Sequence, residues 1–191
     1  MTDQQFKLAT ELVLSATSET LTKLSLKLNL NFLTDEQRLA IELTSGVVLD
    51  WESWFVEYEK KVEKLFSIAI TSPGKPPVVI GAAVYSYDIN NGVVSIHMLE
   101  HFANVIKHTD LNDRMGFIAF TMACTFAKTV DAKKIRIANP LKSVYDYYTH
   151  WGFSMDNKDS CFYCERDSLL DKLGILSREY NGTHDYEYID D

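Results

Sequence analysis

The sequence lacks an excess of positive charge. Its 191 residues include 19 Lys and Arg against 27 Asp and Glu, which gives a formal net charge of −8. A protein that binds the phosphate backbone of nucleic acid needs a cation for each phosphate that it neutralises. The charge balance therefore disfavours a general nucleic-acid binder. It leaves room for a cationic substrate or a basic partner surface.

Cysteines and long apolar runs are also scarce. The three cysteines, Cys124, Cys161 and Cys164, are too few for a disulfide framework. The longest strongly apolar stretch, Val78–Tyr85, is far too short to cross a bilayer. The first six residues lack the basic and apolar regions of a signal peptide. With 46% hydrophobic and 24% charged residues, the chain is predicted to be a soluble, cytoplasmic globular protein without membrane contact.

The first 48 residues are predicted to be rich in helix, because neither Pro nor Gly occurs before Gly46. The segment Thr34–Gln37 resembles a capped helix start. Apolar residues recur at helical spacing at Leu8, Leu12 and Val13, at Leu21, Leu24 and Leu28, and at Leu39 and Leu43. These stripes predict helices that face a core.

A further amphipathic helix is predicted after Asp50, which can cap its start. Large apolar side chains recur at three- and four-residue steps, at Trp51, Trp54, Phe55, Tyr58 and Val62. We expect this aromatic stripe to pack against the sheet or against the N-terminal helices.

The pattern then changes to strands. Residues 65–70, 78–88 and 93–99 predict an antiparallel meander. The Pro- and Gly-containing segment Ser72–Pro77 interrupts the first pair, and Asn90–Gly92 is a hairpin signal because Asn and Gly accept positive φ.

A nearly all-round apolar helix is predicted over 116–130, followed by a strand over 133–138. Asn139 and Pro140 then open a helix that Gly152 ends. Its apolar stripe consists of Leu141, Val144, Tyr148 and Trp151. Cys161–Cys164 predicts a last strand.

This order of elements resembles the GNAT N-acetyltransferase superfamily over roughly residues 65–165. The segment 116–128 looks like the family's acyl-CoA helix, and Tyr148 followed by Gly152-Phe153 resembles its "Tyr, three residues, Gly-Phe" ending. The cofactor pattern of the family is Gln or Arg, two residues, Gly, one residue, Gly or Ala. This chain keeps its last position at Gly116 but has Leu111 and Arg114 at the other two.

The resemblance implies an α/β (α+β) fold with a mixed, mostly antiparallel sheet and flanking helices. Together with the helical pattern of the first third and the acidic end, it predicts three parts: a helix-rich segment (1–48) that the resemblance does not explain, a GNAT-like acyltransferase domain (49–170) and an acidic C-terminal tail (171–191). A parallel pair of the strands 93–99 and 133–138 is expected, with the buried helix as the crossover.

The resemblance also implies that acetyl-CoA is the co-substrate. Its pyrophosphate would then bind at the N-terminus of the buried helix. The residues that would bind it are Leu99, Arg114, Met115, Gly116, Phe117 and Asn139. Arg114 could offer its guanidinium in place of the missing glycine, and Asp113 would repel phosphate unless it caps the helix. On the other interpretation, Asp113 is an ordinary N-cap and Arg114 is solvated. Asn139 either bonds a ligand or only shapes the turn before Pro140.

Two residues are candidates for the chemistry. The resemblance assigns Tyr148 the protonation of the leaving thiolate, although aromatic packing alone could explain it. Glu100 ends the third strand and is the candidate base for the acceptor amine. His97 lies three residues earlier, so a regular strand would put it on the opposite face from Glu100. No metal site is expected, because His97, His101 and His108 give no fixed ligand set and one CxxC pair is weak evidence for zinc.

The function predicted is therefore an acyl-CoA-dependent N-acyltransferase. The acceptor would be an amine-bearing small molecule or a protein lysine, and a homodimer stays open. The alternative is a catalytically inactive GNAT-fold binding or structural subunit, which the reduced cofactor motif favours.

Overall fold

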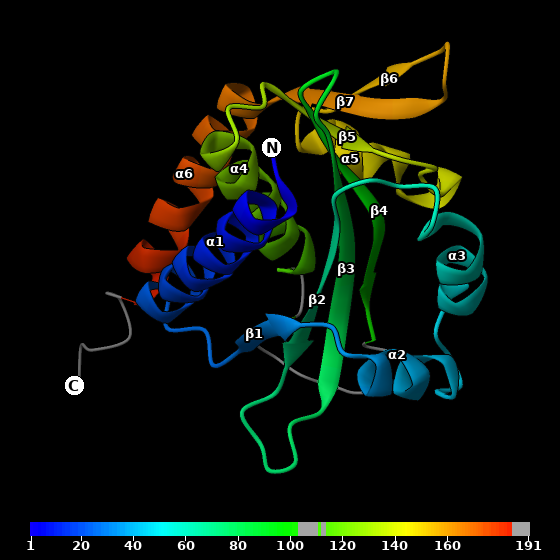
Figure 1. The fold of residues 1–191 in the computed structure, drawn as a ribbon. Coiled ribbons are helices and arrows are strands. Elements are labelled where there is room, and N and C mark those ends of the chain that lie inside the picture. Colours follow the sequence, from blue (N-terminus) through cyan, green and yellow to red (C-terminus); the bar gives the residue numbers. More distant parts are fainter. Residues whose placement is uncertain (103–110, 112–113, 185–191) are drawn as a thin grey trace.

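The computed structural model describes residues 1–102, 111 and 114–184, and it places helices on both faces of one seven-stranded sheet (Figure 1). In chain order the elements are α1 (Asp3–Lys23), β1 (Asn29–Phe32), α2 (Asp35–Glu42), α3 (Trp51–Tyr58), β2 (Leu65–Thr71), β3 (Val79–Asp88), β4 (Val93–His101), α4 (Met115–Thr129), β5 (Lys134–Ile137), the 3-10 helix η2 (Lys142–Val144), α5 (Tyr145–His150), β6 (Ser154–Asp156), β7 (Cys161–Glu165) and α6 (Arg166–His184).

The strand order is β1-β2-β3-β4-β5-β7-β6, and every neighbouring pair is antiparallel except β4–β5. The expected parallel pair is confirmed, with Val93 opposite Lys134 and Ile96 opposite Ile137. Helix α4 is the crossover between the two strands, since a parallel connection needs a long return. The mixed, mostly antiparallel sheet predicted from the sequence is thus confirmed.

One face of the sheet, the α4 face, is covered by α4 with α1 and α6 beside it (Figure 1). This arrangement explains why α4 is apolar on nearly all sides, because it is buried between the sheet and two helices. The predicted inward residues Val13, Leu21 and Leu24 are buried, but Leu8 and Leu12 are each 57% exposed, so the prediction is wrong for these two. Helix α1 also buries Ala9, Thr10 and Thr17.

The N-terminal segment differs from the prediction in three further places. Leu28 does not continue the helix, because α1 ends at Lys23 and the chain then forms the edge strand β1. Thr34 makes the expected capping box, but Leu39 and Leu43 are exposed and α2 buries Ile41 instead. The segment expected to be helix-rich therefore also supplies one strand of the common sheet.

The opposite face of the sheet, the α3 face, is packed by α2 and α3. Trp51, Trp54 and Phe55 are all at most 7% exposed, as the aromatic stripe predicted. Helix α3 ends at Tyr58, one turn before the predicted end at Val62. The aromatic residues of this helix and Ile41 form a second core with Ala82, Val84 and Met98 of the sheet.

Helix α6 extends the fold beyond the sheet. It runs to His184 and packs against α4, so residues 171–184, expected to be part of an acidic tail, are helical. The tail from Asp185 lies outside the described residues.

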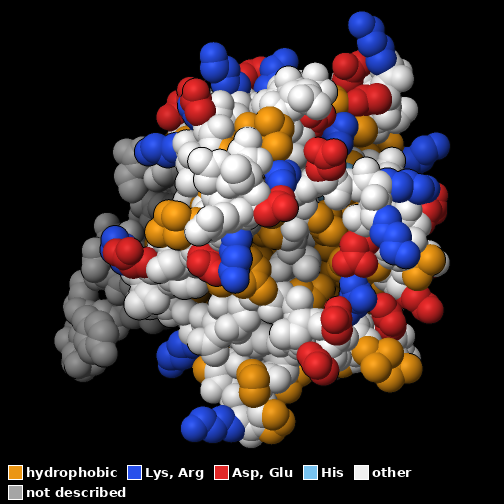
Figure 2. Space-filling model, viewed as in Figure 1, with side chains coloured by type: hydrophobic (Ala, Val, Ile, Leu, Met, Phe, Trp, Pro, Cys, Tyr) orange, Lys and Arg blue, Asp and Glu red, His pale blue; other side chains and the backbone are white. Residues whose placement is uncertain are grey.

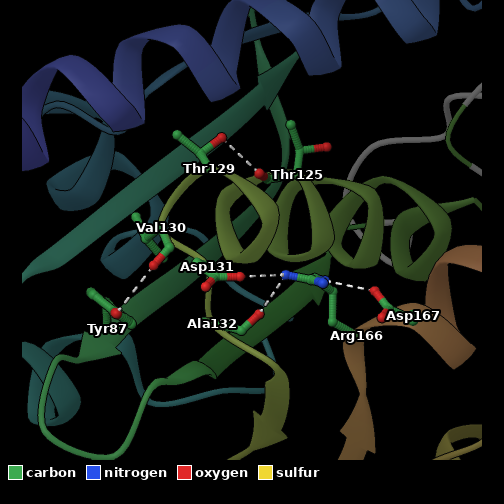
Figure 3. A network of polar contacts seen from close by, with 8 residues as sticks. All are labelled: Tyr87, Thr125, Thr129, Val130, Asp131, Ala132, Arg166 and Asp167. Carbon is green, nitrogen blue, oxygen red and sulfur yellow. Dashed lines mark hydrogen bonds and ion pairs between the residues drawn. The ribbon is translucent and has the colours of Figure 1, made fainter.

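Arg166 connects the start of α6 with the turn after α4 through polar contacts (Figure 3). Its Nη1 donates to Ala132 O at 3.0 Å and lies 3.7 Å from Asp131, and its Nε donates to Asp167.

The connection from β5 to α5 is also less regular than predicted. A 3-10 turn precedes α5, and Leu141 is 46% exposed rather than part of the buried stripe. Tyr148 and Trp151 are buried, and Gly152 ends the helix with φ of +89°. Such a positive φ favours glycine.

No described helix is both long and apolar enough to cross a membrane.

Candidate active site

The middle of β4 contains a β-bulge. Val84 of β3 lies opposite Met98 and Tyr85 lies opposite Ile96, so His97 is an extra residue between them. The expectation that His97 and Glu100 lie on opposite faces is therefore wrong. The His97 ring lies 5.2 Å from the Trp54 ring between centroids, and Glu100 accepts a hydrogen bond from Trp51, so both face α3.

A cleft opens where β4 and β5 stop pairing. The last contact is the hydrogen bond from Ala138 N to Ile96 O at 2.9 Å, after which β5 has ended and β4 continues to His101. Asn139 takes φ of +50° and turns the chain away. The β4–β5 cleft has a volume of about 100 Å³ and is lined by Leu49, Ile96, His97, Met98, Leu99, Ile137, Ala138, Asn139, Pro140, Leu141, Val144 and Tyr148. It thus brings together the predicted residues Leu99, Asn139 and Tyr148.

Tyr148 is a buried phenol at this cleft. It is 8% exposed and packs edge-on against Phe153 and at a tilt against Phe162. Burial, with a smaller contribution from Tyr147, raises the pKa of Tyr148 to about 12. The hydroxyl therefore stays protonated at neutral pH and can donate a hydrogen bond or a proton.

His97 is a cleft residue whose role the sequence did not indicate. Its Nε2 lies 2.7 Å from Ser86 Oγ. Burial, helped by the charge of Arg136, lowers the pKa of His97 to about 4. The imidazole is therefore neutral at physiological pH. The bulge puts Glu100 on the same face as His97, because the extra residue reverses the alternation from Met98 onward. The amino-acid pattern carried no signal for a bulge.

Glu100 is held by three donors from the segment before and at the start of α3. Its Oε1 accepts from Val48 N at 2.5 Å, and its Oε2 accepts from Leu49 N at 3.2 Å and from Trp51 Nε1 at 2.8 Å. The side chain is buried and does not line the cleft. This arrangement gives Glu100 a positioning role, because it fixes Leu49, which does line the cleft. Its role as a base stays a prediction.

The other predicted cofactor residues lie at the start of α4. Arg114 is the N-cap and is partly buried, while Met115, Gly116 and Phe117 form the buried first turn. The N–H groups of Met115 and Gly116 have no partner within the helix, as at any helix start. A Cβ atom on Gly116 would collide with the phenol of Tyr147, so a larger residue here would require the Tyr147 side chain to move. Asn112 and Asp113 lie outside the described residues.

The cysteines and histidines that the structure describes form no metal-binding group. Cys124, Cys161 and Cys164 are free thiols, and no group of three potential metal ligands occurs among the residues that the structure describes. His108 lies outside them.

A larger, open hollow of about 1020 Å³ lies beside the β6–β7 hairpin, but none of the predicted site residues lines it. The β4–β5 cleft is therefore the better candidate.

Comparison with known proteins supports the fold alone. No family model and no curated protein matches the sequence. Among solved structures, the chain is similar to KacT in the KacTA–DNA complex, with 13% identity, TM-score 0.54, and coverage of 78% of this chain and 99% of that one. It is also similar to AtaTR bound with acetyl-CoA, at 11% identity, TM-score 0.57, and coverage of 76% and 98%. A third similar structure is AtaT complexed with acetyl-methionyl-tRNAfMet, at 10% identity, TM-score 0.56 and the same coverage. These structures have the GNAT fold, so the similarity shows this fold for the chain.

Proposed function

We propose that the protein is an acyl-CoA-dependent N-acyltransferase that transfers an acetyl group from acetyl-CoA to an amine. The observation that carries the proposal is the buried, protonated Tyr148 at a cleft between separating strands. The fold adds support, because the matched structures include one bound with acetyl-CoA.

Two neighbouring parts of the chain would hold acetyl-CoA. The α4 start offers the N–H groups of Met115 and Gly116, with Arg114 and Phe117 beside them, to the pyrophosphate. Leu99 and Asn139 would line the path into the β4–β5 cleft. The two parts adjoin, because Tyr147 lies against Gly116 while the next residue, Tyr148, lines the cleft.

Tyr148 would supply the proton that the leaving thiolate needs. When bound, acetyl-CoA supplies the activated acetyl group. Tyr148 would donate its phenolic proton to the sulfur, and the surrounding rings would exclude water from this transfer. The predicted base role of Glu100 is part of the same proposal, but its three N–H donors make a positioning role the better supported one.

The proposed acceptor is an amine on a small molecule or on a protein. An amine-bearing small molecule and a protein lysine were predicted from the resemblance. Two of the similar structures contain nucleic acid, which makes a nucleic-acid partner a further candidate. The net charge of −8 argues against it, and on the face that Figure 2 shows, the described basic side chains are scattered among acidic ones.

The contact between Gly116 and Tyr147 favours a second candidate function. Glycine at a helix start can let a phosphate approach, but here it makes room for a phenol of the chain itself. A GNAT-fold subunit that binds a partner but no longer binds acetyl-CoA would need Gly116 only for this internal contact with Tyr147. Binding of acetyl-CoA separates the two candidates.

A pair of variants tests the proposed enzyme. Tyr148→Phe removes the proton donor and should lower turnover on the order of 10²-fold, with little change in acetyl-CoA affinity, because the hydroxyl acts mainly in the transition state. Arg114→Ala should weaken acetyl-CoA binding and leave turnover of bound substrate nearly intact. The exposed Lys133→Ala is the matched control for loss of one cation. Unchanged turnover in Tyr148→Phe would remove the role proposed for this residue.

A further inference from the structure

We propose that a groove beside α1 binds a partner protein through an amphipathic helix that has a basic residue at one end. This α1 groove has a volume of about 470 Å³, and its lining includes Met1, Leu8, Leu12, Tyr87, Ile89 and Val130. It shares no lining residue with the β4–β5 cleft, so the proposal goes beyond the proposed function and does not depend on it.

Two leucines of α1 line the α1 groove instead of the core. Leu8 and Leu12 stand one helical turn apart and are each 57% exposed, while the other side of the helix is buried next to α4. Met1 and Ile89 add exposed fractions of 38% and 37%. Large apolar side chains that gather in one exposed hollow, rather than singly, are typical of an interaction site.

The α1 groove is built by elements that meet at one end of the molecule (Figure 1). The first turns of α1 form one wall, and the end of β3 with the turn after it and the end of α4 form the other. A capping box fixes the start of α1, because Gln5 N donates to Thr2 Oγ1 at 3.2 Å and Thr2 N donates to Gln5 Oε1 at 2.8 Å. The Tyr87 hydroxyl donates to Val130 O at 3.5 Å and joins the two parts of the other wall. Both walls are therefore in place before a partner arrives.

These walls favour a helix as the occupant. Strand β3 has β2 on one side and β4 on the other, and the backbone of α1 is bonded within the helix. The described walls thus offer no free strand edge, and the occupant has to bind through its side chains. An amphipathic helix does this with apolar residues at positions i, i+3 or i+4, and i+7. The wall from Met1 to Leu12 is about 16 Å long, which matches about three turns of such a helix.

The charges at one end of the α1 groove favour a basic residue on the occupant. Burial raises the pKa of Tyr87, and the carboxylates of Asp131 and Asp88 raise it further, so the field at this hydroxyl is negative. The side chain of Asp131 is 90% exposed although it contacts Arg166, and Asp88 accepts hydrogen bonds from amide groups of the β3–β4 turn. Both carboxylates would attract a lysine or arginine at the end of the occupant that lies near Tyr87.

A second copy of this chain is a poorer occupant than a partner of another sequence. Each copy carries a net charge of −8, and a symmetric contact through the α1 groove would bring the Asp88 and Asp131 side chains of both copies to one interface. Like charges at an interface cost affinity, whereas the same net charge attracts a basic partner.

A library of helical peptides tests the proposal on the whole protein. Peptides of about twelve residues with an alanine-rich frame carry Leu, Lys or Glu at positions i, i+3, i+4 and i+7 and at both ends. They are selected on the wild type and, in parallel, on the double variant Leu8→Glu/Leu12→Glu. We expect the wild type alone to enrich peptides with leucine on one face and lysine at one end.

Fluorescence anisotropy then gives the affinity of an enriched peptide. Its dissociation constant should rise at least about tenfold in the double variant. Leu43→Glu is the matched control, because Leu43 is an exposed leucine of another helix end, and it should leave the affinity unchanged. Asp131→Asn, which suits the φ of +55° at this position, should weaken binding about two- to threefold at low salt and have no effect at high salt.

The remaining outcomes contradict the proposal. Equal enrichment on the double variant, enrichment of glutamate-bearing peptides or no enrichment at all would overturn it. Leu8→Gln/Leu12→Gln repeats the test without added charge, so that a disturbance of α1 by two glutamates cannot be mistaken for lost binding. Light scattering of the free protein addresses the second copy, since a wild-type dimer that disappears in the glutamine variant would make the α1 groove a contact between copies and overturn the partner.

Discussion

Three N–H groups converge on the buried carboxylate of Glu100, and this gives the residue a measurable structural role. Glutamine keeps one oxygen but turns an NH₂ group toward N–H donors. Glu100→Gln should therefore lower the free energy of unfolding by about 1–3 kcal/mol in denaturant titration. Glu165→Gln is the matched control, because Glu165 is exposed and its contact with Lys134 is weak. A loss no larger than that of the control would contradict the positioning role.

His97 should make stability depend on pH. Its pKa is about 4 in the folded protein against about 6.5 in the unfolded chain, so the unfolded state binds the proton first as pH falls. The stabilising contribution is complete above about pH 6.5 and is lost as pH falls towards 4. Between pH 7 and pH 5 this amounts to about 2 kcal/mol.

The variant His97→Gln isolates this effect. Glutamine can keep a hydrogen bond to Ser86 but does not titrate, so the variant should lose about 2 kcal/mol less than the wild type between pH 7 and pH 5. The measurement is denaturant unfolding at both pH values, since other groups titrate equally in both proteins. Parallel losses in the two proteins would show that His97 is not held neutral.

For single residues, the sequence predicted which residue types belong to the site better than it predicted which way their side chains point. Tyr148 was found through the Tyr-to-Gly-Phe spacing, and the structure does place it at the cleft with Asn139 and Leu99. The expected relation between His97 and Glu100 was wrong because period-two reasoning assumes a regular strand, and one inserted residue at the bulge puts both side chains on the same face.

Among the elements, α3 owes its place to its aromatic face. Trp54 is 7% exposed and contacts Phe55, Tyr58 and His97 at centroid distances of 5.2–5.8 Å. Trp54→Ala should lower the free energy of unfolding by about 3–5 kcal/mol. Val56→Ala on the same helix should change it by less than about 0.5 kcal/mol, because Val56 is 76% exposed. Similar losses in the two variants would contradict this packing.

Helix α6 is anchored at its first residue. Arg166 joins α6 to the carbonyl of Ala132 and to Asp131 in the turn after α4 (Figure 3). Arg166→Ala should speed amide hydrogen exchange in the first turn of α6 while the exchange of the central strands stays slow. Lys133→Ala, which removes an exposed neighbouring cation, should leave both unchanged. Equal protection of α6 in the two variants would show that the arginine is dispensable.

Elements with a strong local signal were predictable and short ones were not. The meander, the Asn90–Gly92 turn and the apolar α4 follow directly from periodicity and turn chemistry. Strands β1 and β6 have four and three residues, too few for a pattern to stand out. Leu8 and Leu12 misled because the buried face of α1 consists of Ala9, Thr10, Val13, Thr17 and Leu21, two of which are threonines that a search for apolar residues passes over.

For the whole molecule, the resemblance of the element order and of the Tyr148 to Phe153 segment to the GNAT superfamily implied the fold, and chain logic predicted its parallel pair with α4 as the crossover. The site was only partly predictable. Its cleft depends on where β4 and β5 stop pairing, and its α4 start depends on contact with Tyr147 from α5. Both are tertiary features that bring together residues far apart in the sequence.

Calorimetric titration of acetyl-CoA into the purified protein tests the central claim most directly. The account predicts saturable binding with a stoichiometry near one, weakened in Arg114→Ala and retained in Tyr148→Phe, because the first variant removes a cation near the phosphates and the second removes only a transition-state contact. Binding should also raise the melting temperature as the ligand concentration rises. No binding heat and no stabilisation at millimolar acetyl-CoA would contradict the acyltransferase and leave the GNAT-fold binding subunit in its place.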